Sequence, residues 1–303
     1  MAEKIVSLIK SIDEYVQKAG QDDLADTVPE FPGLEDVPEF VEHFEKTIAK
    51  LLRRQRNFYL DALKDFVAKD DSETLAAYLV FIQQNLFAVD EFKERFGEAA
   101  AEFLQTTIEK LVEKMMESID RDVAFEVLSS RALTWIEEWS RELARIMQLT
   151  THTAVENLLT TAIDEGQSIA DVEMAMKELP AFNRNRARTT AITEVLTACS
   201  HAQHESYAQS PAVTGKKWKH SGGKKNNPRE NHVALDGTVV GVDDLFTIPG
   251  SLEPCAYPRD PSLSASERVH CHCTLGPVVD ESILGLSKEE KLTLKKARLA
   301  LLN

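Results

Sequence analysis

The stretches WKHSGGKKNNPRENHVALDGTVVG (residues 218–241) and HCHCTLGP (residues 270–277) decide the fold. Six of the eight histidines and three of the four cysteines lie between residues 201 and 273. Asp-Gly and Gly-Pro pairs bound short β-branched runs here, which predicts a small antiparallel sheet of two or three strands. We therefore expect a compact α+β module near the C-terminal end of the chain.

Three runs in this module are predicted strands. They cover Val213–His220, Gly237–Gly241 and Cys271–Leu275, and Gly276-Pro277 is expected to close the last one. Successive side chains of a strand point to opposite faces, so Cys271 and Cys273 should share one face. Residues 242–269 are rich in proline and glycine, and we expect them to form a long irregular loop.

The rest of the chain is predicted to be helical, because its apolar residues recur at three- and four-residue steps. The expected helices cover residues 3–18, 39–69, 72–96, 98–118, 131–149, 150–165, 168–178, 183–208 and 287–301. Ser72 and Ser168 are expected to begin helices, and Gly97 to end one. Residues 21–38 mix prolines with acids, which predicts a linker rather than a packed element.

The predicted fold class is therefore mainly α, with an elongated helical N-terminal body and a small α+β C-terminal module. We divide the chain into a helical region (residues 1–149) with its linker, a C-terminal domain (residues 150–278) and a basic helix (residues 279–303). The basic helix has the composition of a tail that docks on a partner protein.

The net charge of −15 is uneven along the chain. Residues 1–150 carry 18 Lys+Arg against 31 Asp+Glu (18 − 31 = −13), and residues 151–303 carry 17 against 19 (17 − 19 = −2). Such an acidic front half is repelled by nucleic acid unless its charges segregate onto separate faces, and it suits contacts with other proteins. We expect no secretion signal, no membrane span and no disulfide framework, which indicates synthesis in a reducing cytoplasm.

A basic stretch in the module is the candidate contact for nucleic acid. Its residues are Lys216, Lys217, Trp218, Lys219, Lys224, Lys225 and Arg229. Lysines in a flexible loop can follow phosphates, and an indole can stack on a base, so we expect salt-sensitive, sequence-independent binding of double-stranded DNA. The alternative is a solvated hairpin tip whose lysines only keep the chain soluble.

A metal site is a second candidate. Two thiolates one residue apart suit tetrahedral zinc, so the expected ligands are Cys271 and Cys273, with His232 or Cys255 arriving from elsewhere in the chain. The alternative is that the cysteines are small buried residues of the core and that no cofactor is bound.

Two further polar sets have competing interpretations. Arg229, Asn231, His232 and Asp236 loosely resemble the polar sets of metal-dependent nucleases, or they fix a turn by local hydrogen bonds. Three arginines at the start of the helix 183–208 oppose its macrodipole, so they contact a partner anion or form ion pairs within the chain. They are Arg184, Arg186 and Arg188.

The order of single residues along the module carries a resemblance. Arg188, Thr193 and Glu194 on a helix precede Trp218, Arg229-x-x-His232, Leu235-Asp236-Gly237, Phe246, a proline-rich loop and Cys271-x-Cys273. This order resembles the C-terminal domain of the phage Mu F-like minor head proteins, also called phage head morphogenesis proteins, over residues 150–278. The sequence departs from the usual family pattern at His272 between the two cysteines and at Cys255.

The resemblance implies a structural virion component of a tailed bacteriophage. Such a protein is expected to associate with the portal and with capsid or scaffolding proteins, in the head interior or at the portal vertex, after a stay in the host cytoplasm. Its role would lie in procapsid assembly, DNA packaging or DNA delivery, without enzymatic activity. The competing classes are a metal-dependent nuclease or processing enzyme, tested by His232→Ala, and a DNA-binding regulator, for which no recognition helix is visible.

Overall fold

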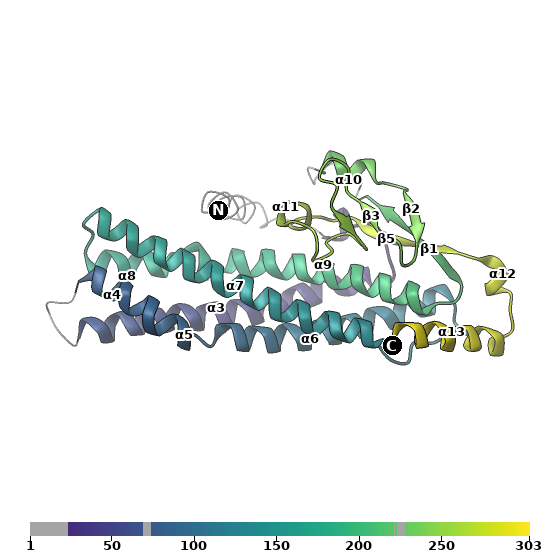
Figure 1. Cartoon of the computed structure of the whole chain (residues 1–303), viewed down its shortest axis with the longest axis horizontal. Helices are drawn as coiled ribbons and strands as arrows, with labels where there is room; N and C mark the ends of the chain where they lie inside the picture. Colours follow the sequence, from purple (N-terminus) through teal and green to yellow (C-terminus); the bar gives the residue numbers. More distant parts are fainter. Residues whose placement is uncertain (1–23, 69–73, 221, 223–227) are drawn as a thin grey trace. The chain divides into compact units, whose positions relative to one another are not determined.

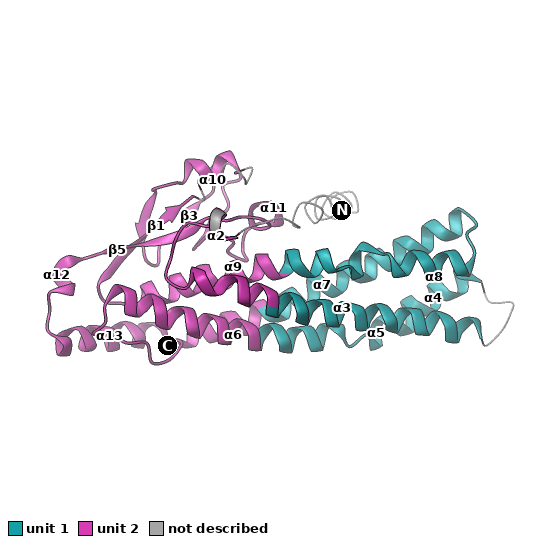
Figure 2. Ribbon diagram, turned by 180° about the vertical axis from the view of Figure 1, so that it is seen from behind, with its two compact units in different colours: residues 1–20, 43–101, 140–190 teal, residues 21–42, 102–139, 191–303 magenta. Residues whose placement is uncertain are grey.

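The computed structural model describes residues 24–68, 74–220, 222 and 228–303. These residues form two compact units, shown in different colours in Figure 2. The described residues of unit 1 lie within His43–Ala101 and Ser140–Thr190, and those of unit 2 lie within residues 24–42, Glu102–Trp139 and Ala191–Asn303. The boundary expected between residues 149 and 150 therefore falls inside one long helix.

The predicted fold class, mainly α with a small antiparallel sheet, is confirmed (Figure 1). The α-helices are α2 (Leu24–Thr27), α3 (Val37–Val67), α4 (Leu75–Phe81), α5 (Phe87–Val89), α6 (Phe92–Ile119), α7 (Ser130–Asp164), α8 (Ile169–Lys177), α9 (Arg184–Gln209), α10 (Glu230–Ala234), α11 (Ala265–Arg268), α12 (Glu281–Leu284) and α13 (Lys288–Leu302). Short 3-10 turns cover Leu34–Asp36 and Pro180–Phe182, and a π-helical turn covers Ile82–Leu86. The strands are β1 (Val213–Lys219), β2 (Val239–Gly241), β3 (Phe246–Thr247), β4 (Pro254–Cys255) and β5 (Thr274–Val279).

Helix caps explain several of these boundaries. Ser168 begins α8 as predicted, because its hydroxyl accepts the N–H of Asp171 while the Asp171 carboxylate accepts the N–H of Ser168. Ser287 and Glu290 make the same reciprocal pair at the start of α13. The predicted helix 3–18 and the expected start at Ser72 lie outside the described residues.

The prediction that Gly97 ends a helix is wrong. The chain leaves the helical conformation at Asp90, whose ψ is 104°, and α6 then runs through Gly97. The Asp90 carboxylate accepts the N–H of Phe92, which satisfies a free donor in the first turn of α6. The two helices predicted over residues 131–165 are likewise one continuous helix, α7.

The interpretation of residues 21–38 as an unpacked linker is also wrong. Leu24, Val28 and Phe31 are each no more than 6% exposed. Apolar burial of this extent stabilises an ordered segment despite its prolines. Gly33 adopts a φ of 95° directly before the turn Leu34–Asp36, a conformation that glycine adopts readily.

The three-stranded sheet has the order β2-β1-β5 and is antiparallel throughout. Trp218 of the central strand pairs with Leu275, and Lys216 pairs with Pro277. Gly276-Pro277, expected to close the last strand, instead lies inside it. A proline is accommodated there because β5 is an edge strand.

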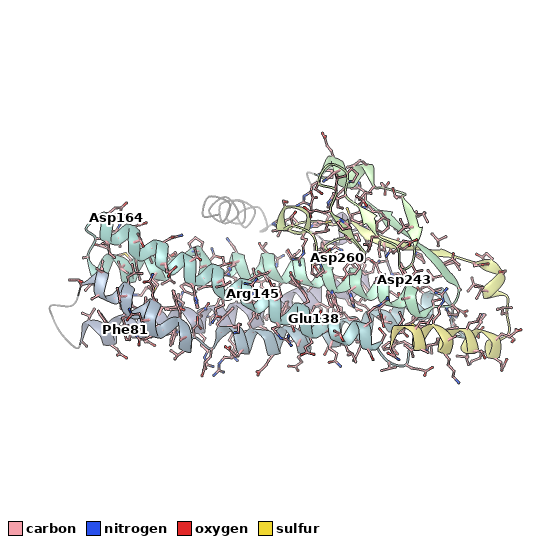
Figure 3. All side chains as sticks on the ribbon, viewed as in Figure 1. Phe81, Glu138, Arg145, Asp164, Asp243 and Asp260 are labelled. Carbon is pink, nitrogen blue, oxygen red and sulfur yellow. The ribbon has the colours of Figure 1, made fainter. Side chains whose placement is uncertain are left out.

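Residues 242–269 are more regular than predicted. Strands β3 and β4 form a second small sheet, in which Phe246 pairs with Cys255, and α11 follows. Asp260, labelled in Figure 3, lies between β4 and α11, and its carboxylate accepts the N–H of Ala256 at 2.7 Å. A turn closed by a side chain in this way holds a proline-rich segment without strand pairing.

The core of the β-rich part is built around Trp218, which is fully buried. Its ring meets Phe246 edge to face, with centroids 5.3 Å apart. Gln203 on α9 ties the helix to β5, because its side chain donates to the carbonyl of Leu275 and accepts from the N–H of Leu275 and the hydroxyl of Thr274. The sheet is therefore anchored to α9.

Helix α13, expected to be a docking tail, places Lys291, Lys295 and Arg298 against its own chain. Lys291 pairs with Asp120 and Asp122, and both Lys291 and Lys295 are less than 5% exposed. Among the residues that the structure describes, no helix combines the length and the apolar character that a membrane span requires.

Candidate functional site

A cluster of one histidine and two cysteines lies buried in the β-rich part of unit 2. The imidazole Nδ1 of His232 lies 3.5 Å from the Cys271 Sγ and 3.8 Å from the Cys273 Sγ. All three side chains are buried, each about 2% exposed, and their ligand atoms lie within 4.8 Å of one another. The structure therefore brings together three of the four residues predicted to bind a metal.

A carboxylate orients the imidazole of this cluster. The Nε2 of His232 lies 2.8 Å from the Glu267 Oε2, and Asn231 donates its amide to the Glu267 Oε1 at 3.0 Å. A carboxylate accepts hydrogen bonds but does not donate them. In the neutral imidazole the proton of His232 therefore lies on Nε2, and the lone pair on Nδ1 faces the two sulfurs.

Arg259 closes the other side of the cluster. Its guanidinium is 1% exposed and donates to the carbonyl oxygens of Cys271 and Cys273 at 2.6 and 2.7 Å, and to the Ser200 hydroxyl at 2.6 Å. The Nη1 also lies 3.8 Å from the Cys271 Sγ. Sequence reasoning missed this residue, because a single Arg in a proline-rich loop carries no periodic signal.

The surroundings act differently on the two thiols. The pKa of Cys271 lies well below its usual range, because Cys273 donates a hydrogen bond to its sulfur and the positive charge of Arg259 further stabilises the thiolate. The same hydrogen bond, together with burial, holds the pKa of Cys273 well above its usual range. Cys271 is therefore the sulfur that carries a negative charge first.

Cys255 does not belong to the group that the other three residues form. It lies on β4, is 1% exposed and packs in the same core. Burial raises the pKa of its thiol to about 12, so Cys255 has the properties of a small apolar core residue.

The expectation that Cys271 and Cys273 lie on a strand is wrong, because both precede β5. His270 adopts a φ of 54°, so the chain turns sharply just before Cys271. The Nδ1 of His272 lies 2.9 Å from the hydroxyl of Thr27. The two thiols meet His232 through this turn and not through strand alternation.

The basic stretch does not present the surface that was predicted. Trp218 and Lys216 are fully buried, so neither can contact a nucleic acid in this fold. Lys219 donates to the carbonyl of Glu30, and Arg229 donates to the carbonyl of Val269 at 2.6 Å. Lys217 is exposed on β1. Lys224 and Lys225 lie outside the described residues.

Lys216 is a buried cation in this core. Burial lowers its pKa to about 8, although the more distant carboxylates of Asp243 and Asp260 (Figure 3) act in the opposite direction. Its Nζ lies 5.8 Å from the centroid of the Phe246 ring and has no hydrogen-bond partner among the described residues. A cation–π contact thus adds to the compensation that these carboxylates give.

The four residues that loosely resembled a nuclease set are held by structural contacts. Asn231 and His232 bind Glu267, Arg229 binds a carbonyl, and the Asp236 carboxylate accepts the N–H of His220 at 2.8 Å. Gly237 adopts a φ of 78° in the turn that leads to β2, and its N–H binds the carbonyl of Trp218. The turn interpretation is therefore the one these contacts favour.

The arginines that begin α9 bind groups of their own chain. Arg184 and Arg188 both contact the Glu45 carboxylate, at 2.6 and 3.0 Å. Arg186 is 7% exposed and donates to the carbonyls of Met147 and Ala181. Intramolecular pairing is therefore what the structure shows for all three.

Thr193 and Glu194, the motif residues that follow, are buried on α9. The Glu194 carboxylate accepts the indole N–H of Trp139 at 2.7 Å and lies 3.4 Å from the guanidinium of Arg268. Burial raises the pKa of Glu194 against the opposing effects of Arg268 and Trp139.

Unit 1 contains a basic pocket that sequence reasoning missed. It has a volume of about 660 Å³ and is bounded by α3, α8 and the start of α9. Six basic and two acidic side chains line it, together with Ala49, Phe182 and Asn183: Lys46, Lys50, Arg53, Arg56, Lys177 and Arg184, with Glu45 and Glu178. The helical spacing of Lys46, Lys50 and Arg53 was a visible signal for one face of this pocket.

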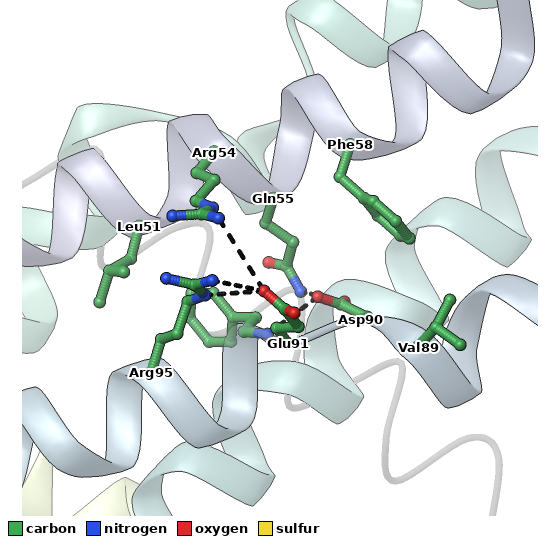
Figure 4. Close-up of a pocket in the computed structure, with 9 residues that line it drawn as sticks. Leu51, Arg54, Gln55, Phe58, Val89, Asp90, Glu91 and Arg95 are labelled. Carbon is green, nitrogen blue, oxygen red and sulfur yellow. Dashed lines mark hydrogen bonds and ion pairs between the residues drawn. The ribbon is translucent and has the colours of Figure 1, made fainter.

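A smaller pocket of about 260 Å³ lies where α5 gives way to α6 in unit 1 (Figure 4). Arg54 and Arg95 both point to the Glu91 carboxylate, at 3.9 and 2.6 Å. Beside it, the buried Asp90 accepts hydrogen bonds from Gln55 and Tyr59. The charged groups of this pocket are thus matched with one another, which favours a structural role.

Residues 153–276, which include the motif helix, both small sheets and the His-Cys cluster, match the family described as phage Mu protein F like protein. This part of the chain therefore carries a domain of the phage Mu F-like family, a family of phage head proteins. The resemblance expected from the order of single residues is therefore confirmed.

Two curated relatives are similar to the chain. One is the uncharacterized protein YqbB of Bacillus subtilis (strain 168), 58% identical over 300 residues, which are 98% of each chain. The other is the NAD(+)–arginine ADP-ribosyltransferase EFV of Enterococcus faecalis (strain ATCC 700802 / V583), 33% identical over 138 residues, which are 45% of this chain and 26% of that protein. No solved structure matches the chain.

Proposed function

We propose that the chain is a minor head protein of a tailed bacteriophage, a structural virion component that associates with the portal. Its role is in procapsid assembly, DNA packaging or DNA delivery. The observation that carries the proposal is the family match over residues 153–276, which covers the motif residues and the β-rich part as far as the start of β5. We place the protein in the host cytoplasm during assembly and then in the head interior or at the portal vertex.

The burial of the reactive groups supports a non-enzymatic role. Cys271, His232 and Glu267 have the order of a nucleophile, a base and an orienting carboxylate. However, Cys271 and His232 are each about 2% exposed, so a substrate has no access to the sulfur in this conformation. A nuclease or processing enzyme remains the alternative, and it requires an opening of this core.

The test uses the phage that encodes the protein. We expect deletion of the gene to give defective heads or non-infectious particles. In the parent phage, mass spectrometry should detect the chain in purified procapsids or mature heads, and the portal ring should co-purify with it. Normal yields of infectious particles from the deletion mutant contradict the proposal, as does metal-dependent cleavage of DNA that His232→Ala abolishes.

A second candidate function is sequence-independent contact with DNA phosphates through the basic pocket of unit 1. In a chain whose front half carries a charge of −13, six basic side chains around one pocket form a local concentration of positive charge. Such a surface binds phosphate oxygens with a strong dependence on salt.

Charge-reversal variants distinguish DNA binding by this pocket from DNA binding by the basic loop predicted from the sequence. We expect Lys50→Glu/Arg53→Glu to weaken binding of double-stranded DNA and to lower the slope of log K against log salt by about 2. Lys288→Glu/Lys296→Glu on α13 is the matched control, since both lysines are exposed there. A third variant tests whether the predicted loop binds the DNA instead: Lys217→Glu/Lys224→Glu/Lys225→Glu. Equal affinity and slope for the pocket variant and the parent contradict the assignment to the pocket.

A further inference from the structure

The geometry points to a structural zinc site in which the Nδ1 of His232 and the Sγ atoms of Cys271 and Cys273 are ligands. These atoms come from two segments: α10 supplies the imidazole, and the turn before β5 supplies both sulfurs. The inference does not depend on the role of the protein in the phage head, because it concerns how the β-rich part is held together.

The separations between the ligand atoms match those of a zinc site. Zinc lies about 2.3 Å from sulfur and about 2.0–2.1 Å from nitrogen, so tetrahedral geometry places nitrogen and sulfur about 3.6 Å apart. The observed separations from the Nδ1 of His232 are 3.5 Å to Cys271 and 3.8 Å to Cys273. Both nitrogen–sulfur separations therefore suit one shared ion, and all three ligand atoms lie within 4.8 Å of one another.

Hydrogen bonding within this cluster offers the two thiols only one strong acceptor. A neutral imidazole has one acceptor nitrogen, and its single lone pair faces two thiols here. Only one thiol can donate along that lone pair with good geometry, and the other donates to a sulfur, which is a weak acceptor. A cation at the common focus is bound by the lone pair and by both sulfurs, so it satisfies all three groups.

The groups around the cluster are those expected beyond the ligands of a metal. Glu267 accepts from the Nε2 of His232, the carboxylate–histidine arrangement that fixes the tautomer of zinc-binding histidines. Arg259 donates to the carbonyls of both cysteines and so fixes the backbone that presents the sulfurs. Two thiolates and one zinc ion sum to zero charge, which suits a core whose ligands are about 2% exposed.

The proposed ion cross-links segments that are distant in sequence. His232 lies 39 residues before Cys271 and 41 before Cys273, and β3, β4 and α11 lie between them. A fourth position completes the tetrahedron and is filled by water, because Cys255 lies outside the group of ligand atoms. Closing a segment of this length stabilises the folded state.

The first test is metal content. The full chain, purified without chelators from cells grown with zinc, should contain about one zinc per chain by plasma mass spectrometry. Cys271→Ser and Cys273→Ser should each lose most of it. Cys199→Ser is the matched control, because Cys199 is equally buried (1% exposed) but lies outside the cluster, and it should keep its zinc. Zinc that persists in Cys271→Ser/Cys273→Ser contradicts the ligand assignment.

The second test needs no variant to fold. Cobalt(II) added to the reduced, zinc-free parent chain should produce sulfur-to-metal charge-transfer absorption and the visible bands of tetrahedral cobalt. Zinc should then remove both and raise the melting temperature. The proposal is overturned if the purified parent chain contains no metal, takes up no cobalt and is not stabilised by zinc. A thiol–imidazole hydrogen-bond network would then hold the cluster.

Discussion

The indole of Trp139 donates its N–H to the Glu194 carboxylate at 2.7 Å, and the guanidinium of Arg268 lies over the same indole ring, 4.3 Å from its centroid. Helices α7, α9 and α11 therefore meet in one buried group of an aromatic ring, an acid and a base. Because Glu194 is 3% exposed and Arg268 contacts it directly, the two charges depend on each other.

Glu194→Gln should destabilise the fold. The amide oxygen can still accept from Trp139, but Arg268 loses its counter-charge in a largely buried place, which costs about 3 kcal/mol. Urea unfolding measures the change. Glu142→Gln is the control, because the Glu142–Arg145 pair is about half exposed and should be worth at most about 1 kcal/mol. Equal effects of the two substitutions disagree with a buried ion pair.

Arg259→Lys should destabilise unit 2 even though it keeps the charge. A lysine cannot reproduce the planar fork that reaches the carbonyls of Cys271 and Cys273 and the hydroxyl of Ser200. We expect a loss of about 2–4 kcal/mol from the unsatisfied buried acceptors. Thermal unfolding measures it against Arg53→Lys on the exposed face of α3 as control. A melting temperature equal to that of the parent shows that Arg259 is not needed to hold the turn.

Lys216→Met should stabilise the protein near pH 7, by roughly 2 kcal/mol, because it removes a charge from the core. Burial lowers the pKa of Lys216 to about 8 in the folded chain, whereas the unfolded chain keeps its ordinary value. Between pH 8 and about 10.5 the unfolded state binds more protons, so the parent gains stability as the pH rises through this window. The difference between variant and parent should therefore shrink from pH 8 to pH 10, as followed by urea unfolding. A difference that does not change with pH argues against a lowered pKa.

Two buried histidines should make the protein sensitive to acid. Burial lowers the pKa of His201 to about 3, with a smaller effect of Arg131, and burial also lowers the pKa of His204 well below its usual value. Below about pH 6.5 the unfolded chain binds protons that the folded chain does not, so stability is lost as the pH falls from 6.5 towards 3.

The His201→Phe variant tests this acid dependence. His201 stacks on Trp135 at a centroid distance of 3.9 Å, a contact that Phe can replace. The slope of unfolding free energy against pH between 4 and 6.5 should fall by up to about 1.4 kcal/mol per pH unit. His43→Phe, at an exposed position of α3, should leave the slope unchanged. An unchanged slope in His201→Phe assigns the acid sensitivity to other groups.

The helices were predictable wherever one local rule decided the outcome. The three- and four-residue apolar spacing of α3 and the Ser168 cap of α8 are readable in the sequence and are confirmed. The break at Asp90 was not readable, because it depends on Gln55 and Tyr59, which lie more than 30 residues away. Gly97, the residue that local reasoning favoured as a breaker, packs inside α6.

The candidate site was predictable in composition but not in contacts. His232, Cys271 and Cys273 were identifiable from residue type, whereas Glu267 and Arg259 reach them only through tertiary structure. Trp218 was wrongly predicted to contact nucleic acid, because the neighbouring lysines suggested an exposed basic loop. It lies instead on the face of β1 that points into the core. Since Lys216 and Trp218 are two residues apart, alternation alone places them on one face, and the core takes both.

The order β2-β1-β5 has a consequence for biosynthesis. The middle strand is translated first, and its second neighbour leaves the ribosome only after some sixty further residues. Until then Trp218 lacks Leu275 opposite it, and one edge of the strand is unpaired. A nascent or prematurely terminated chain that ends before Thr274 therefore exposes an aromatic strand edge, which chaperones and proteases can recognise.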